Sequence, residues 1–143
     1  MLLEVKAASV DFGRISAIRN VSINVDEGSV VTIIGGNGAG KSTTLRAISG
    51  LAKLSAGEIL FEGERIDHLP PDKIVGKGIA HVPEGRRVFP DLTVEENLRT
   101  GAFLRRDKDA VETDLTAVFK RFPRLKERRG QRAKTMSGGE QQM

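Results

Sequence analysis

One eight-residue loop constrains this chain more than any other feature of its sequence. Residues 35–42 have the sequence GGNGAGKS and match the pattern G-x-x-x-x-G-K-[ST] at every fixed position. The run VVTII at 30–34 precedes the loop, and TTLRAISG at 43–50 follows it. A continuous β-branched run predicts a strand buried on both faces, and the second segment predicts a short helix that stops at Gly50. We therefore expect a strand–loop–helix unit.

The loop predicts binding of a nucleoside triphosphate with Mg²⁺. Glycines let successive backbone N–H groups converge on phosphate oxygens, and the positive end of the following helix points at the same anion. Lys41 supplies a mobile charge for the outer phosphates, and the Ser42 hydroxyl is a candidate Mg²⁺ ligand. A turn that binds nothing would need the fixed positions of this eight-residue pattern to match by chance between a strand and a helix. The residues expected at the nucleotide are Gly35, Gly36, Asn37, Gly38, Ala39, Gly40, Lys41, Ser42 and Thr43.

Composition restricts the class of protein further. The chain has 143 residues, of which 38% are hydrophobic and 29% charged, a balance that predicts one globular domain or part of one and excludes wholesale disorder. No run approaches the roughly 18 consecutive apolar residues needed to span a bilayer, so any membrane contact is expected to run through a partner. The absence of cysteine excludes disulfides and thiolate metal sites, and two histidines are too few for a histidine-built metal cluster.

A β-rich part is expected in residues 1–92. Alternating apolar residues predict half-buried antiparallel strands in LEVKA at 3–7 and VSINV at 21–25. The segment GEILFEGERI at 57–66 is typical of a hairpin that turns at Glu62-Gly63, and GIAHV at 78–82 predicts another buried strand. The apolar positions expected on the buried face of the first strand are Leu3, Val5 and Ala7.

A helical part is expected in residues 93–143. Thr93 and Glu96 have the spacing of a capping box, which predicts a helix that continues to about Leu104. Asp107 is expected to cap the next helix, which ends before Pro123. The apolar residues of that second helix fall on one face: Val111, Leu115, Val118, Phe119 and Phe122.

A second candidate anion site lies in MSGGEQQM at 136–143. Ser137 and Glu140 have the spacing of another capping box, and Gly138 and Gly139 leave backbone N–H groups uncovered at a helix start. Taken alone, the pattern is equally compatible with an ordinary helix cap, so both interpretations stay open at this point.

The formal charge of +4 is unevenly distributed. Residues 120–134, KRFPRLKERRGQRAK, carry eight Lys or Arg and one acid, a net charge of +7 that leaves −3 on the rest. Such a segment can contact nucleic acid or anionic lipid headgroups, or it can be a solvated helical face. The solvated face is favoured because the only interleaved aromatic residue is Phe122 and no strand platform accompanies it. We therefore expect no nucleic-acid partner.

The loop at 35–42 and MSGGE at 136–140 together resemble the nucleotide-binding domain of ABC transporters, whose signature is LSGGQ or close to it. HVPEGRRVFPDLTVEENL at 81–98 and RFPRLKERRGQRAKTMSGGEQQM at 121–143 are similar to the LivF type, the ATP-binding subunits of bacterial branched-chain amino-acid importers. The resemblance covers essentially all 143 residues. It implies the α/β fold of a P-loop NTPase with an antiparallel β part, a partial RecA-like core and a helical subdomain.

The resemblance implies roles for further residues. Phe12 stands where the family places an aromatic residue that stacks on adenine, more often Tyr, and a buried core Phe is the alternative. Glu84 stands at the position of the Q-loop glutamine, which implies a role at Mg²⁺ or the attacking water and as a coupling hinge. Glu84 and Lys41 are the residues expected to take part in catalysis. The signature residues would contact the γ-phosphate of ATP held on the opposite protomer: Ser137, Gly138, Gly139 and, in the same site, Glu140.

The resemblance also implies partners and an activity. ATP and Mg²⁺ are the expected cofactors, and the expected partners are a second ATP-binding subunit in a head-to-tail dimer, membrane permease subunits and, indirectly, a periplasmic amino-acid-binding protein. The subunit is expected at the cytoplasmic face of the inner membrane, with Arg86 and Arg87 facing the permease. The implied activity is ATP hydrolysis that drives uptake of branched-chain amino acids. The alternatives are a nucleotide-binding module without hydrolysis and a soluble ABC-type ATPase that acts on nucleic acid or ribosomes.

Several motifs of the family have no counterpart in the 143 residues. These are the Walker B aspartate, the catalytic glutamate, the D-loop and the switch histidine, together with strands that flank 30–34 in the family. We therefore expect the N-terminal part of a longer subunit, which by itself binds ATP without hydrolysing it. We also expect it to associate or to be marginally stable, because an uncovered apolar strand is a template for pairing.

Overall fold

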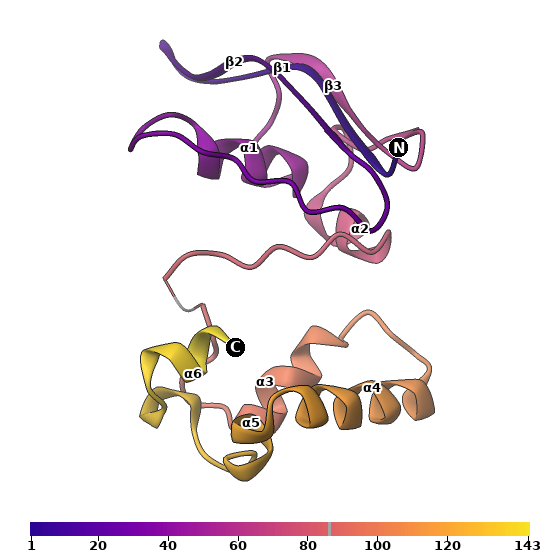
Figure 1. Cartoon of the computed structure of the whole chain (residues 1–143), viewed down its shortest axis with the longest axis vertical. Helices are drawn as coiled ribbons and strands as arrows, with labels where there is room; N and C mark the ends of the chain where they lie inside the picture. The colour runs from indigo at the N-terminus through magenta and orange to yellow at the C-terminus, as the bar shows by residue number, and fades with distance from the viewer. Residues whose placement is uncertain (86) are drawn as a thin grey trace. The chain divides into compact units, whose positions relative to one another are not determined.

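The computed structural model describes residues 1–85 and 87–143. The chain forms two compact units, Met1–His81 and Val82–Met143 (Figure 1). Residues 82–92, which the sequence pattern groups with the β-rich part, belong to the second unit. Within the described residues, no helix is long and apolar enough to cross a membrane.

The first unit contains a four-stranded antiparallel sheet in the order β2-β1-β3-β4 (Figure 1). Its strands are β1 (Leu3–Phe12), β2 (Ile15–Val25), β3 (Ala56–Phe61) and β4 (Glu64–Arg65). The expected strands at 3–7 and 21–25 are thus confirmed, as is the hairpin that joins β3 to β4. Its turn residues, Glu62 and Gly63, both have positive φ, which is the geometry of a two-residue hairpin loop.

Strand β1 contains a β-bulge that changes which side chains face the core. Ala7 has φ +49, and the pairing register with β2 shifts between Val5 and Ala8. An extra residue in one strand reverses the alternation of buried and exposed side chains in the part of the strand that follows it. Ala8 and Val10 are therefore buried, whereas Ala7 is exposed. The expectation that Ala7 lies on the buried face was wrong for this reason.

The core of the first unit combines residues of the sheet with helix α1 (Lys41–Ile48). Helix α1 ends as expected: the Gly50 N–H donates to Ala47 O at 3.1 Å. A Cβ at Gly50 would lie 2.8 Å from Cδ1 of Ile74, the buried residue of α2 (Pro71–Gly76). The buried members of this core are Val5, Ala8, Val10, Ile18, Ala47, Ile48, Ala52, Ile59 and Ile66.

The prediction of strands at 30–34 and 78–82 was wrong for the described residues. Neither segment forms a strand, and Val30, Ile34 and Val82 are 93%, 90% and 75% exposed. A strand of a parallel sheet exists only through hydrogen bonds to neighbours along its edges. The ladders of the described residues are antiparallel and pair β1 with β2, β1 with β3 and β3 with β4, so neither run has a partner strand among them.

The second unit is helical (Figure 1). Its elements are α3 (Val94–Gly101), α4 (Lys108–Arg121), α5 (Pro123–Glu127), the 3₁₀ helix η1 (Ala133–Thr135) and α6 (Gly138–Gln142). Thr93 and Glu96 form the expected capping box, but α3 ends at Gly101 and turns follow it to Leu104. Asp107 precedes α4 without capping it, because its carboxylate pairs with Arg105 at 2.6 Å instead.

The core of the second unit is small. Val94, Phe119, Leu125 and Met136 are buried together, with Leu98, Leu115 and Phe122 packed against them. Backbone hydrogen bonds also join segment 90–95 to segment 129–134. The bonds are Val94 N–H to Gln131 O (3.0 Å), Glu95 N–H to Arg129 O (3.0 Å), Ala133 N–H to Leu92 O (2.9 Å) and Lys134 N–H to Pro90 O (3.0 Å). Residues immediately before Met136 are thus held by a segment some forty positions earlier.

Candidate nucleotide-binding site

The glycine-rich loop is attached to the sheet at Gly40. This residue is the N-cap of α1 and has φ +87. A Cβ here would lie 2.2 Å from Cγ2 of Ile18 and 2.8 Å from the Ala17 carbonyl oxygen. Any side chain would therefore clash with β2 as well as strain the backbone. The close contact explains why the last glycine of the motif is required, and it places the start of α1 against β2.

Lys41 folds back over the loop that precedes it. Its Nζ donates to the carbonyl oxygens of Gly35 and Gly36, both at 2.7 Å. The Ala39 N–H donates to Gly36 O at 3.2 Å and closes a turn within the loop. A flexible ammonium group is thus held beside the loop backbone. The role of Lys41 at the outer phosphates remains a prediction.

The loop is open enough to accept a phosphate chain. Residues 35–39 are exposed, and a Cβ at Gly36 or at Gly38 would meet nothing within 4 Å. In the described residues there is no group of three or more His, Cys, Asp or Glu that could hold a metal. A hydroxyl such as that of Ser42 is a hard oxygen ligand, and Mg²⁺ commonly combines few protein ligands with phosphate oxygens and water. The loop therefore fits a magnesium–nucleotide complex.

Phe12 lies at the end of β1, where it pairs with Ile15 across the hairpin. Its side chain is 53% exposed, so Phe12 is not a core residue. Gly40 packs against Ala17, two residues beyond Ile15 on β2. Phe12 and the loop therefore lie toward the same end of β2. Its adenine-stacking role remains a prediction.

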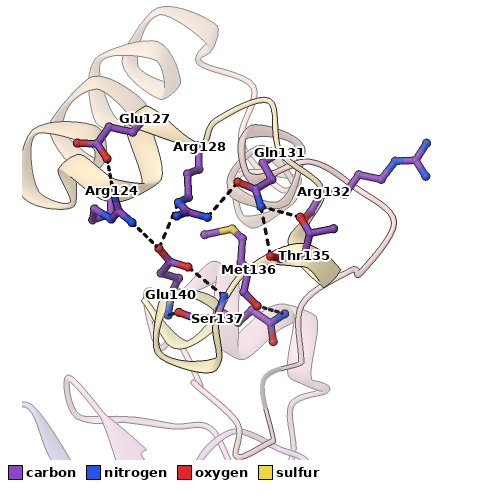
Figure 2. Close-up of polar contacts among 10 residues, drawn as sticks. Arg124, Glu127, Arg128, Gln131, Arg132, Thr135, Met136, Ser137 and Glu140 are labelled. Atoms are coloured by element: carbon purple, nitrogen blue, oxygen red, sulfur yellow. Dashed lines mark hydrogen bonds and ion pairs between the residues drawn. The ribbon is translucent and has the colours of Figure 1, made fainter.

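The second motif begins a helix as its spacing predicts. The Ser137 N–H donates to Oε2 of Glu140 at 2.9 Å, and the Glu140 N–H donates to the Ser137 hydroxyl at 3.4 Å (Figure 2). Met136 is buried in the core of the second unit, while Ser137 and Gly139 are exposed. Hydrogen bonds from the Ser137 backbone and hydroxyl, followed by nearby arginines, hold the pKa of the Glu140 carboxyl below its ordinary value. Glu140 is therefore charged near neutral pH.

The basic segment 120–134 forms many ion pairs inside the second unit. Arg124 pairs with Glu127 at 2.7 Å, and Arg129 pairs with Glu95 at 3.1 Å. Lys134 pairs with Asp91 at 2.7 Å. These contacts favour the interpretation of the segment as a solvated helical face, because much of its charge is balanced locally.

Glu84 lies at the start of the second unit and is exposed, as is Arg87. Arg86, the other residue expected to face a permease, lies outside the described residues. Ser42 belongs to the first unit and Glu84 to the second, so the shared magnesium site remains a prediction.

Comparison with known proteins identifies the family. The model of the family described as "ABC transporter" matches residues 18–143. The chain belongs to the ABC transporter family. It is 51% identical over 142 residues to the high-affinity branched-chain amino acid transport ATP-binding protein BraG of Pseudomonas aeruginosa, an alignment that covers 99% of this chain and 60% of that protein. It is 40% identical over 124 residues to the probable branched-chain amino acid transport ATP-binding protein LivF of Archaeoglobus fulgidus, with 87% and 52% covered.

A solved structure extends the agreement to the fold. The ATP-binding subunit of an ABC transporter superposes with a TM-score of 0.84 at 34% sequence identity, covering 99% of this chain and 58% of that one. The resemblance to ABC ATP-binding subunits and the fold class are thus confirmed. The chain spans about 60% of the length of BraG and about half that of LivF.

Two sets of contacts in this ABC chain are not predicted by its sequence patterns. Thr44 is 3% exposed and its hydroxyl donates to Gly40 O at 3.0 Å, which fixes the start of α1. Arg124 and Arg128 both approach Glu140 (Figure 2). Thr44 could have been found from its position four residues after Gly40, a spacing at which hydroxyls bond back to the helix backbone. Nothing in the sequence indicates which acidic residue each arginine pairs with.

Proposed function

We propose that the chain forms the ATP-binding part of an ABC importer subunit that couples ATP binding and hydrolysis to uptake of branched-chain amino acids. The observation that carries the proposal is the open loop at 35–42, attached to β2 at Gly40, with the Lys41 ammonium beside its backbone. The cargo is supported by the names of BraG and LivF, which are both described as branched-chain amino acid transport ATP-binding proteins.

Within this proposal, each predicted site residue has one task. Backbone N–H groups of residues 35–43 and the Lys41 ammonium bind the phosphates, and the exposed Phe12 ring stacks on adenine. The Ser42 hydroxyl and Glu84 are the Mg²⁺ ligands. Mg²⁺, when bound, neutralises charge on the phosphates.

The proposed partners follow from the same family. Ser137, Gly138, Gly139 and Glu140 contact ATP held by a second ATP-binding subunit in a head-to-tail dimer. Permease subunits bind in the region of Arg87 and hold the subunit at the cytoplasmic face of the inner membrane, and a periplasmic amino-acid-binding protein acts only through them. Residues 1–143 alone bind ATP without turning it over, and nucleic acid is not a partner.

Calorimetric titration of the chain with Mg-ATP tests the proposal. Lys41→Ala is expected to weaken binding by about 10- to 100-fold, because a charge-assisted hydrogen bond contributes roughly 1.5–3 kcal/mol. Lys53→Ala removes an exposed lysine of the same unit and is expected to leave the affinity unchanged. Equal affinity in the native chain and Lys41→Ala would contradict the proposal. The chain has no Trp or Tyr, so co-purified nucleotide would dominate its ultraviolet spectrum and is easily detected.

A further inference from the structure

The carboxylate of Glu140 uses its two oxygens for two different tasks. Oε2 accepts the hydrogen bond from the Ser137 N–H at 2.9 Å. Oε1 lies 3.3 Å from Nη2 of Arg124 and 3.3 Å from Nε of Arg128. Figure 2 shows the two guanidinium groups converging on this oxygen, while the other oxygen faces Ser137. Only 12% of the Glu140 side chain is exposed.

We propose that Arg124 and Arg128 are positioning residues that hold the Glu140 carboxylate and, through it, fix the position of Ser137, the N-cap of α6. Two arginines on one carboxylate remove its freedom to rotate, so Oε2 stays aimed at the Ser137 N–H. They also balance the negative charge beside residues that the proposed function places at a phosphate. The importance of the arrangement for ATP rests on that proposed function, whereas the contacts themselves do not.

The two arginines are themselves held in place. Arg124 also pairs with Glu127, and its neighbour Leu125 is buried in the core of the second unit. Arg128 Nη1 donates to the side-chain oxygen of Gln131 at 3.2 Å. The Gln131 amide in turn donates to the hydroxyl of Thr135, the residue immediately before the motif, at 2.7 Å (Figure 2). The support therefore extends along both α5 and η1.

This geometry requires a carboxylate at position 140. A glutamine side chain has one oxygen and one NH₂ group. If its oxygen accepted the Ser137 N–H, its NH₂ would face two guanidinium groups, which are donors only. If its oxygen faced the arginines, its NH₂ would face the Ser137 N–H. Glutamine at this position is therefore compatible with the Ser137 bond only when the arginines are absent.

Amide hydrogen exchange at Ser137, followed by NMR in the full 143-residue chain without nucleotide, tests the inference. Exchange is expected to accelerate about two- to tenfold in the variant Arg124→Gln plus Arg128→Gln, since ion pairs whose arginines are partly exposed are worth a few tenths to one kcal/mol each. Glu140→Gln is expected to accelerate it as well. Adding the two arginine substitutions to Glu140→Gln is expected to slow exchange or leave it unchanged.

The matched control is Arg132→Gln, which removes the same charge from the same segment. The Arg132 side chain points away from Glu140 (Figure 2), so exchange at Ser137 is expected to stay at the native rate. The Val94 amide, bonded to Gln131 O, reports whether the second unit stays folded.

Three results would overturn the inference. They are a native exchange rate in the double arginine variant, an equal acceleration by the arginine substitutions with and without Glu140→Gln, and a parallel acceleration at Val94. Because no nucleotide is present, none of them depends on the P-loop, and a failure of ATP binding is detected separately through Lys41→Ala.

Discussion

At the scale of single residues, Gly40 is the position in the loop where packing leaves no space for a side chain. Its φ of +87 is unfavourable for any L-residue with a Cβ, and the Cβ would overlap Ile18. Gly36, in the same loop, would tolerate a Cβ because nothing lies within 4 Å of it. Gly40 is a fixed position of the pattern G-x-x-x-x-G-K-[ST], whereas Gly36 is a variable one, and their structural requirements differ in the same way.

Gly40→Ala is expected to destabilise the first unit by roughly 2–4 kcal/mol, the sum of a left-handed backbone penalty and overpacking against Ile18. Gly36→Ala, as the control, is expected to change the free energy of unfolding by less than about 0.5 kcal/mol. Urea denaturation followed by circular dichroism measures both. A Gly40→Ala variant as stable as Gly36→Ala would show that the contact with β2 is not maintained.

Asp67 is the residue from which a pH dependence follows. Its Oδ1 accepts from the Ile59 N–H at 3.1 Å, and the Arg65 guanidinium donates to both carboxylate oxygens at 3.0 and 3.1 Å. Burial raises the pKa of the Asp67 carboxyl, but the hydrogen bonds from Arg65 and Ile59 outweigh it and hold the pKa below its ordinary value.

The sign of the pH effect follows from that shift. Because the folded-state pKa is the lower one, the stability that the Asp67 carboxylate contributes is complete above the ordinary value of 3.8 and is lost as the pH falls through the folded pKa. We expect Asp67→Asn to be less stable than the native chain at pH 6 and the difference to shrink toward pH 3. Urea denaturation across this range measures it, and a constant difference would contradict the assignment.

At the scale of elements, two helices of the second unit, α3 and α6, begin with side-chain caps. Thr93 and Glu96 cap α3, and Ser137 and Glu140 cap α6 in the same way. Asn97 in α3 adds a link to the preceding segment, since its side chain accepts from the Phe89 N–H at 2.8 Å and donates to Phe89 O at 3.0 Å. Local hydrogen bonds of this kind determine where short helices start, because each bond satisfies a backbone N–H of the first helical turn that has no partner within the helix.

Thr93→Ala is expected to lower the stability of the second unit by about 1 kcal/mol, because it removes the acceptor for the Glu96 N–H. Thr113→Ala is the control: this hydroxyl bonds back to Asp109 O within α4, and alanine has the higher helix propensity. Thr113→Ala is therefore expected to be neutral or slightly stabilising. Urea denaturation of both variants provides the measurement, and equal losses would argue against the capping box as the cause.

At the scale of the whole molecule, a run of apolar side chains is exposed between the sheet and the phosphate loop. In segment 30–34, Val30 and Ile34 are 93% and 90% exposed, and Val31 is 46% exposed. The segment forms no ladder with another described strand. Extended apolar segments with unpaired backbone groups pair readily with other chains.

We therefore expect the 143-residue chain to associate as its concentration rises, and Ile34→Lys to reduce that association at least several-fold. Light scattering across a dilution series measures it. Phe103→Lys is the control, because Phe103 is 87% exposed but lies in a turn outside this run. A native chain that stays monomeric at all concentrations, or an equal effect of the two substitutions, would contradict the role of segment 30–34.

Features that depend on neighbours a few residues away could be predicted from the sequence alone. The glycine loop, the hairpin at Glu62-Gly63 and the capping boxes at Thr93 and Ser137 are all closed by bonds or turns within about four residues, so their spacing alone predicts them. The motifs of the ABC family belong to this class, because phosphate binding is encoded in one short loop.

Tertiary structure decided the features that depend on distant partners. Whether segment 30–34 forms a strand depends on neighbouring strands. An apolar run predicts that its side chains are buried, but it does not indicate which part of the protein covers them. The bulge at Ala7 follows from pairing with β2, not from any unusual residue type in β1. The choice of Glu140 by Arg124 and Arg128 depends on where α5 meets α6. Charges find partners by proximity in space, and the order of residues along the chain does not encode that proximity.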